Sequence, residues 1–275
     1  MPSSRRSVLT IAFLQGLATA GASQDDVPRG ITLSDLTWVE AEQVLKPETI
    51  VVIPLGAASK EHGPHLRLDN DFRMAEYLTA RVHQAADVII APTISYHFYP
   101  AFLEYPGSTH LRFETARDVV VDIVRSLASY GPRRFYILNT GVSTLRPLKA
   151  AADSLARFGI LLGYTNVLEV ASDVEARVIR QERGTHADES ETSMMLYIAP
   201  DRVDMSKAVK DDRPTRPGGL TRREDGPGVY SPSGVWGDAT LATREKGRVI
   251  VEATVAGILR EIEALRTVPL PAPPR

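Results

Sequence analysis

The amino-acid sequence predicts an α/β fold in which a parallel sheet carries helices on both faces. Short apolar runs rich in β-branched residues alternate with longer runs that have apolar residues at three- and four-residue spacing. The short runs are typical of buried parallel strands, and the longer runs are typical of amphipathic helices. Regular alternation of the two favours one parallel sheet between two layers of helices.

The first predicted strands are each closed by a Pro or a Gly. They are TIVVIPLG at 49–56, DVIIAPT at 87–93 and RFYILNTG at 134–141. Amphipathic helices are predicted between them at 71–86 and at 113–131, and Gly131 is the expected stop of the second helix. Strand and helix therefore alternate through this part of the chain.

The second half continues the pattern. It is expected to contain a helix at 145–158, a strand at 159–167, a helix at 189–198 and a last helix at 243–266. Residues 211–237 are rich in Pro and Gly without periodicity, which is typical of a long loop that is functional or disordered. No internal repeat is present, so a single domain at 24–268 suits this length.

The two ends of the chain are predicted to lie outside that domain. Residues 1–23 have Arg5 and Arg6, then a short apolar stretch, then small residues, which is the order expected of a cleavable export signal. SRRSVL also resembles the twin-arginine pattern, so Sec and twin-arginine export are both open. The mature protein is expected to be periplasmic or secreted, without a membrane segment; the alternative is a helix retained on a cytosolic protein. The Pro-rich tail at 269–275 is expected to be disordered.

Composition narrows the chemistry. The 32 Lys and Arg residues are offset by 34 Asp and Glu residues without a long basic stripe, which argues against a nucleic-acid partner. The chain has no cysteine. Disulfides, thiolate metal sites and cysteine nucleophiles are therefore excluded, and any metal must be held by His, Asp or Glu, which suits zinc, manganese or iron.

A first polar cluster, SKEHGPHLRLDND, follows the first predicted strand. Open α/β sheets place their sites at the carboxyl ends of strands, which makes Glu61, His62 and Asp71 candidate ligands for a divalent cation. The alternative is a solvated turn. Asp69 or Asn70 is expected to cap the next helix.

A second polar cluster, GTHADESETSMML, opens the predicted helix at 189–198. Carboxylates are common at a helix start because they complement the helix dipole, so on spacing alone this cluster is structural. His186 and Glu191 become candidate catalytic residues if the fold brings them beside the first cluster. One would then serve as acid or base and the other as a ligand.

The residues considered for the wall of a substrate pocket are His65, Glu104, Tyr230 and Trp236. Glu104 adjoins a predicted turn. Tyr230 and Trp236 belong to the Pro- and Gly-rich loop, where they would cover a pocket and exclude water, with core packing as the alternative.

Together these motifs resemble the creatininase family, also called creatinine amidohydrolases. The family's Pro-x-Gly turn, Glu, His-Gly-Pro-His core and downstream Asp are matched by PLGAASKEHGPHLRLDND. Later family motifs are matched by YPGS at 105–108, HADESETS at 186–193 and GVWGDATLATREKG at 234–247. The resemblance implies a three-layer α/β/α fold, a di-metal centre that hydrolyses a non-peptide amide, and a homo-oligomer.

Carried over by residue, the resemblance makes His62 a metal ligand and Asp71 the carboxylate that bridges two ions. His186 resembles the family's catalytic His, and Glu191 the Glu of its Glu-Thr-Ser motif. Glu61 departs from the common pattern, in which one residue separates the Glu from the His, whereas here the two are adjacent.

A larger departure follows the strand at 134–141. Many family members have Asn-Gly-His there, whose His binds metal, and some have a Glu two residues later; this chain has Gly141 and Ser143 at those positions. Neither residue replaces an imidazole or a carboxylate as a strong ligand. Three alternatives follow: one metal at the first cluster completed by Glu191 or water, a rearranged site that recruits His65 or His186, or loss of the metal. One ion and two ions both stay open.

The leading hypothesis is an exported, metal-dependent amidohydrolase that acts on a small cyclic or formyl-like amide. A zinc, manganese or iron ion would lower the pKa of bound water toward about 7, and the hydroxide would attack the amide carbon. His186 would protonate the leaving nitrogen, because its ordinary pKa near 6.5 suits proton exchange at neutral pH. The alternative is a non-catalytic periplasmic small-molecule binding protein, favoured by the missing Asn-Gly-His and by Arg67 where the family usually has Pro.

Overall fold

The computed structural model describes residues 27–272. The predicted export signal at 1–23 and the last three residues of the predicted tail lie outside the described residues. Within the described part, no helix is both long enough and apolar enough to cross a membrane.

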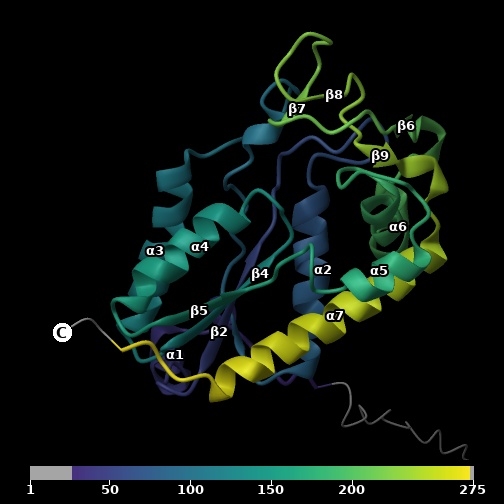
Figure 1. Cartoon of the computed structure of the whole chain (residues 1–275). Helices are drawn as coiled ribbons and strands as arrows, with labels where there is room; N and C mark the ends of the chain where they lie inside the picture. Colours follow the sequence, from purple (N-terminus) through teal and green to yellow (C-terminus); the bar gives the residue numbers. More distant parts are fainter. Residues whose placement is uncertain (1–26, 273–275) are drawn as a thin grey trace, which may run out of the picture.

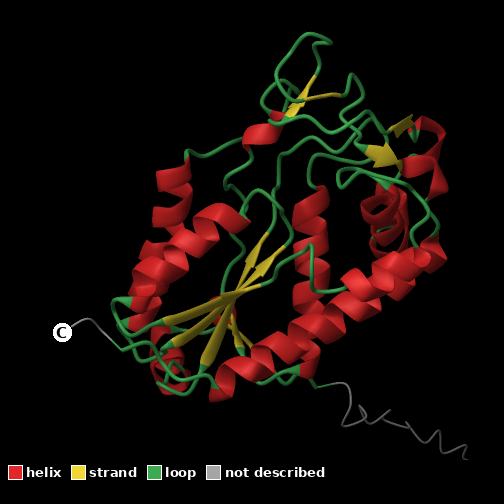
Figure 2. Ribbon diagram, viewed as in Figure 1, coloured by secondary structure: helices red, strands yellow, loops and turns green. Residues whose placement is uncertain are grey.

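Five parallel strands form the central sheet, in the order β1-β3-β2-β4-β5. They are β1 (Ile31–Thr32), β2 (Ile50–Leu55), β3 (Ile89–Ile90), β4 (Arg134–Asn139) and β5 (Leu161–Tyr164). Strands β2 and β4 pair along their whole length, from Ile50 opposite Arg134 to Leu55 opposite Asn139. The carboxyl ends of these two strands therefore lie side by side in the middle of the sheet (Figure 2).

Helices cover both faces of the sheet (Figure 1). They are α1 (Trp38–Val44), α2 (Asn70–Ala85), α3 (Phe113–Ala128), α4 (Leu145–Ala156), α5 (Ser172–Val178), α6 (Glu189–Ile198) and α7 (Arg244–Thr267). Successive strand side chains point to opposite faces, so Ile50 and Val52 pack with α2, α6 and α7, whereas Val51 and Ile53 pack with α3 and α4. Two apolar cores result, and the predicted three-layer α/β/α architecture is confirmed.

The predicted strand at 87–93 is shorter than expected, because only Ile89–Ile90 forms regular pairs on both sides. Pro92 has no N–H with which to continue the ladder. The chain then returns to β2 through a single bridge between Ile94 and Leu55.

The long loop at 211–237 contains short strands that the sequence did not predict. They are β6 (Lys210–Asp211), β7 (Leu220–Thr221), β8 (Val229–Tyr230) and β9 (Gly237–Asp238). Strand β6 pairs with β9 and β7 pairs with β8, so this segment folds over the carboxyl edge of the main sheet (Figure 1).

The predicted side-chain cap of α2 is wrong. Asp69 occupies the N-cap position, but its carboxylate accepts hydrogen bonds from the side chains of Arg73 and Arg202 and none from a backbone N–H of the helix. The side chain of Asn70 has no hydrogen-bond partner. The guanidinium groups of Arg73 and Arg202 therefore bind the Asp69 carboxylate, which would otherwise cap the helix.

Candidate metal centre

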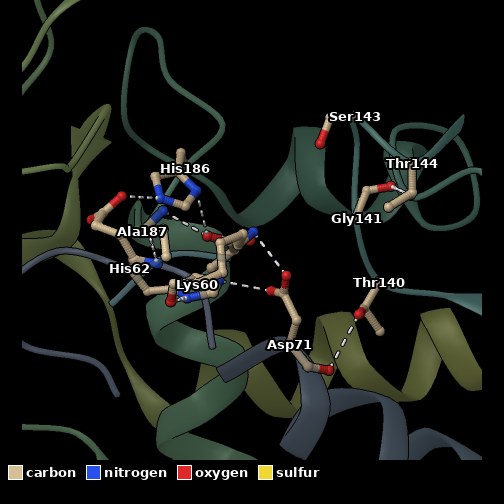
Figure 3. A network of polar contacts seen from close by, with 12 residues as sticks. Lys60, His62, Asp71, Thr140, Gly141, Ser143, Thr144, His186 and Ala187 are labelled. Carbon is tan, nitrogen blue, oxygen red and sulfur yellow. Dashed lines mark hydrogen bonds and ion pairs between the residues drawn. The ribbon is translucent and has the colours of Figure 1, made fainter. Parts of the chain in front are cut away.

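Two segments that are far apart in the sequence meet beyond the carboxyl ends of β2 and β4. The loop that leaves β2 carries His62, and the turn that enters α6 carries His186. The ring centroids of these two residues are 5.2 Å apart, and Figure 3 shows both in one polar network. The fold therefore brings His186 beside the first polar cluster, which is the condition under which His186 and Glu191 become candidate site residues.

Three side chains of this network have the arrangement of a metal site. One ring nitrogen each from His62 and His186 and one carboxylate oxygen of Glu191 all lie within 4.8 Å of one another, and residues 27–272 contain one such group. Both histidines are buried and Glu191 is partly buried. Two imidazoles and a carboxylate suit zinc or manganese. The three residues therefore fit one divalent cation.

The ring of His62 is held from both sides. Its Nδ1 lies 2.9 Å from the carbonyl oxygen of Lys60, and its Nε2 lies 2.7 Å from Oδ1 of Asp71. A carbonyl oxygen only accepts hydrogen bonds, so Nδ1 is the donor in the first contact, and Nε2 is the nitrogen that faces Asp71. Such backbone contacts fix the tautomer of a metal-binding imidazole.

Asp71, in the first turn of α2, is fully buried between two cationic or polar partners. Its Oδ1 faces His62, and its Oδ2 lies 2.8 Å from Nζ of Lys60 (Figure 3). Burial acts to raise the pKa of Asp71, but the Lys60 ammonium and His62 outweigh it and hold this pKa well below its usual range. Asp71 is therefore an ionised carboxylate inside the protein.

Glu61 turns to the other side and contacts His186. Its Oε2 lies 3.0 Å from Nε2 of His186, and its Oε1 accepts a hydrogen bond from the backbone N–H of Gly63. Burial by itself would raise the pKa of Glu61 and lower that of His186. The attraction between the two charges prevails, so the pKa of Glu61 is lowered and that of His186 is raised. The pair therefore favours an imidazolium beside a carboxylate in the metal-free protein.

A strained turn positions the second cluster. The backbone of His186 forms an antiparallel bridge with Trp236, and Ala187 then adopts a positive φ of 48° before α6 begins. The N–H of Ala187 donates to Oε2 of Glu191 over 2.6 Å. Non-glycine residues at positive φ are uncommon and cluster at functional sites. This turn directs His186 and Glu191 toward the same point.

A cavity of about 670 Å³ opens beside the network. Its lining includes Lys60, Phe102, His186, Glu191 and Trp236. This volume lies within the range of about 300–1,000 Å³ that is typical of small-molecule pockets. The predicted pocket role of Trp236 agrees with this lining.

The other predicted pocket residues do not line the cavity. His65 is buried, its Nε2 lies 2.8 Å from Oγ1 of Thr192, and burial lowers the pKa of His65 to about 4. It packs under α6, and so the loop turns it away from the cavity.

Glu104 and Tyr230 are also displaced from the cavity. The Glu104 carboxylate accepts hydrogen bonds from Oγ1 of Thr221 and from the N–H of Arg222. The ring of Tyr230 lies under the Arg213 guanidinium, 5.1 Å from ring centroid to Cζ. Both side chains thus contact the loop at 211–237, and their roles in substrate binding stay predictions.

Of the predicted ligands Glu61, His62 and Asp71, the cluster of three contains only His62. Glu61 and Asp71 are adjacent to the cluster, each through a hydrogen bond to one of its histidines. The ligand roles of all these residues stay predictions.

The turn after β4 is closed by hydrogen bonds among its own residues. Asn139 accepts from the N–H of Gly141 and from Oγ1 of Thr144, so its side chain holds the turn closed. Ser143 donates to the carbonyl of Phe98. This turn therefore brings neither an imidazole nor a carboxylate to the site.

Lys60 is the site residue that sequence reasoning missed. The signal was present, because the creatininase pattern has Glu two residues before the His, and Lys60 occupies that place before His62. Glu61 is one position closer to His62 than the Glu of the family pattern.

Comparisons with known proteins agree with the fold. The family model described as creatinine amidohydrolase matches residues 34–262. Creatinine amidohydrolase of Pseudomonas putida is 26% identical over 249 residues, which cover 84% of this chain and 95% of that protein. Mycofactocin precursor peptide peptidase of Mycobacterium tuberculosis is 29% identical over 242 residues, which cover 84% of this chain and 91% of that protein.

Solved structures of creatininase have the same fold. One described as a manganese form has a TM-score of 0.73 at 24% identity and covers 87% of this chain and 100% of its own. A mutant described as "Zn-Zn type" has a TM-score of 0.72 at 25% identity and covers 87% and 99%. Structural neighbours are thus known in manganese and zinc forms, and the family model spans most of this sequence. The chain belongs to the creatininase family.

Proposed function

We propose that this protein is a metal-dependent amidohydrolase that cleaves a C–N amide bond of a small molecule. The observation that carries the proposal is the cluster of His62, His186 and Glu191 beside a cavity of about 670 Å³. The activities for which two relatives are named, creatinine amidohydrolase and a precursor peptide peptidase, support hydrolysis as the reaction class. Export rests on the pattern of residues 1–23 alone.

The proposed ligands are the three cluster residues, which corresponds to a rearranged site that recruits His186. A divalent cation bound there supplies Lewis-acid polarisation of a carbonyl group and lowers the pKa of water. His186 and Glu191 then act as ligands, in place of the acid–base roles that the sequence suggested.

The remaining residues orient this set. The Lys60 carbonyl holds Nδ1–H of His62, and Glu61 holds Nε2–H of His186, so that Nδ1 of His186 faces Glu191 at 3.7 Å. Carboxylate and carbonyl partners of this kind fix ring orientation and increase ligand basicity.

The substrate that we propose is a non-peptide amide, cyclic or formyl-like. The lining of the cavity includes apolar side chains such as Phe102 and Trp236 and polar side chains such as His186 and Glu191. A mixed lining of this kind suits a small ligand that has an apolar body and a polar reacting group. A peptide is the competing substrate class, and the assay must include it.

Metal analysis together with a hydrolysis panel tests the proposal. Protein purified without chelator is expected to contain zinc, manganese or iron and to hydrolyse a member of a panel of lactams, formamides, creatinine and short peptides. His62→Ala is expected to lose both properties, and His83→Gln, which changes a histidine at the far end of α2, is expected to keep both. Metal-free protein that binds a panel compound without turnover would favour the alternative binding function.

A further inference from the structure

A buried ammonium group lies at the wall of the cavity. The side chain of Lys60 is 5% exposed, and its Nζ lies 2.8 Å from Oδ2 of Asp71, whose side chain is 1% exposed. The rings of Phe102 and Tyr99 lie 4.7 Å and 5.5 Å from the same nitrogen. Charges are seldom buried in proteins unless they are paired. Lys60 is therefore the counter-ion of Asp71.

Both oxygens of Asp71 are engaged within the protein. Oδ1 faces Nε2 of His62, and Oδ2 faces the Lys60 ammonium (Figure 3). In the two-metal site that the family resemblance implies, Asp71 would be the carboxylate that bridges the two ions. The Asp71 oxygen that would accept such an ion already faces a positive charge, which would repel the ion.

The turn at 139–144 offers no side chain that could serve as a ligand for a second ion. Oγ1 of Thr140 lies 3.1 Å from the carbonyl oxygen of Leu55 and 3.2 Å from that of Asp71, and Oγ1 of Thr144 is bonded to Asn139. The turn at 139–144 contains no His, Asp or Glu. Hard or borderline cations need such donors to bind tightly.

We propose that the Lys60 ammonium takes the place of a second metal ion, so that each chain holds a single divalent cation at His62, His186 and Glu191. Lys60 neutralises Asp71, and Asp71 in turn holds His62. This inference rests on the proposed function, because it presupposes that the first cation binds. It goes further in fixing the number of ions and in giving Lys60 a role in the site.

The number of bound ions tests the proposal directly. Full-length protein is dialysed to equilibrium against an excess of zinc or manganese, and metal and protein are then measured by elemental and amino-acid analysis. One ion per chain is expected. Two ions would overturn the role of Lys60 and leave the proposed hydrolase standing, whereas no ion would overturn the proposed function and this inference with it.

Two variants of Lys60 test whether its positive charge excludes a second ion. Lys60→Glu replaces the ammonium by a carboxylate beside Asp71, and it is expected to raise the ratio from one ion to two. Lys60→Arg keeps the positive charge and is expected to stay at one. A Lys60→Glu protein that still binds one ion would show that the charge at this position does not exclude the second ion, and the proposal would fail.

A spectroscopic measurement keeps the test independent of whether the variants fold. Manganese-saturated wild-type protein is expected to give the six-line paramagnetic resonance spectrum of isolated ions. Ions of a two-metal site lie only about 3.5–4 Å apart, so they couple magnetically and give a multiline spectrum. A coupled spectrum from the wild type would overturn the proposal.

Discussion

Nε2 of His186 lies 3.0 Å from Oε2 of Glu61, although the two residues are 125 positions apart in the chain. This hydrogen bond joins the loop after β2 to the turn before α6. It also decides which nitrogen of His186 faces Glu191, because Nε2 is occupied by Glu61 and Nδ1 is left 3.7 Å from the Glu191 carboxylate. Glu61 thus acts on the site through His186.

Glu61→Gln is expected to weaken metal binding while all three proposed ligands are kept. Loss of a carboxylate partner behind a metal-binding histidine typically lowers metal affinity by about 10–100-fold, and we expect at least the lower value, about tenfold. Competition with a chromophoric chelator measures the change. Glu104→Gln removes a carboxylate that binds Thr221 on the outer loop and should leave affinity unchanged. Equal affinities of Glu61→Gln and wild type would contradict the role of Glu61.

The same pair predicts how the stability of the metal-free protein depends on pH. The pKa of His186 is raised in the fold, so its contribution is present below its ordinary pKa near 6.5 and is lost as the pH rises through the raised value. The pKa of Glu61 is lowered, so its contribution is present above its ordinary value of 4.5 and is lost as the pH falls through the lowered value. Between these limits the pair stabilises the fold most.

Urea unfolding of metal-free wild type and Glu61→Gln across this pH range checks the prediction. The free energy of unfolding of the variant should be lower by about 1–3 kcal/mol at neutral pH, as for loss of a charged hydrogen bond. The difference should shrink at acidic and at alkaline pH. A difference that does not vary with pH would show that the two side chains do not titrate as a pair.

Asp188 predicts a pH effect opposite in sign to that of Glu61. It is fully buried at the N-cap of α6, and burial together with the charge of Glu191 raises its pKa to about 6 from an ordinary 3.8. The folded state therefore binds a proton that the unfolded state has lost. Stability should fall as the pH rises from about 3.8 to about 6, by a total on the order of 3 kcal/mol.

Asp188→Asn is expected to abolish that fall, because the amide oxygen still caps the helix and carries no charge. Above about pH 6 the variant should be at least as stable as the wild type when both are metal-free. Asp225→Asn changes an exposed carboxylate and should leave the pH profile unaltered. The prediction is wrong if Asp188→Asn keeps the wild-type slope in this range.

Elements that bury a regular face were predictable from the sequence. Strand β2 is buried along its whole length and α3 buries one face, so both left a clear apolar pattern. Strands β6 to β9 span two residues each and pair at only two positions, which leaves no periodicity to detect. The shortness of β3 is visible in retrospect from Pro92, which cannot donate to the ladder.

The site was predictable only to the level of its segments. The positions of His62 and Asp71 after a strand followed from the rule that sites lie at strand ends. His186 was identified from the resemblance to the family, because on spacing alone its cluster is typical of a helix start. The partners of these residues depend on how distant segments pack. No local sequence pattern shows that Lys60 is buried against Asp71. Nor does one show that His65 contacts Thr192, 127 positions further along the chain.

Trp236 is expected to set substrate affinity. Its ring lines the cavity, its indole N–H donates to the carbonyl of Arg213, and its backbone pairs with His186. Trp236→Ala keeps the backbone pairing and removes the wall, so KM for a substrate found in the panel should rise by about tenfold or more, the scale of one large apolar contact. Trp38→Ala removes a ring that is 78% exposed and should change neither KM nor kcat. An unchanged KM in Trp236→Ala would show that substrate does not reach this wall.

Close packing between α6 and α7 predicts a strong effect at Gly247. A Cβ atom there would lie 1.8 Å from the backbone oxygen of Ser193, in the helix that carries Glu191. A backbone atom cannot yield as a flexible side chain does, so Gly247→Ala must push α6 away from α7. Overpacking of this kind costs about 1–3 kcal/mol and occasionally more, and we expect the upper end of that range.

Displacement of α6 should also move Glu191, so the metal affinity of Gly247→Ala is expected to fall along with its free energy of unfolding. Ala256→Gly, at an exposed position of α7, serves as the control, because it should cost only the helix propensity of about 1 kcal/mol and leave metal affinity unchanged. Urea unfolding and chelator competition measure the two quantities. Gly247→Ala with lowered stability and wild-type metal affinity would show that Glu191 does not depend on this helix contact for its position.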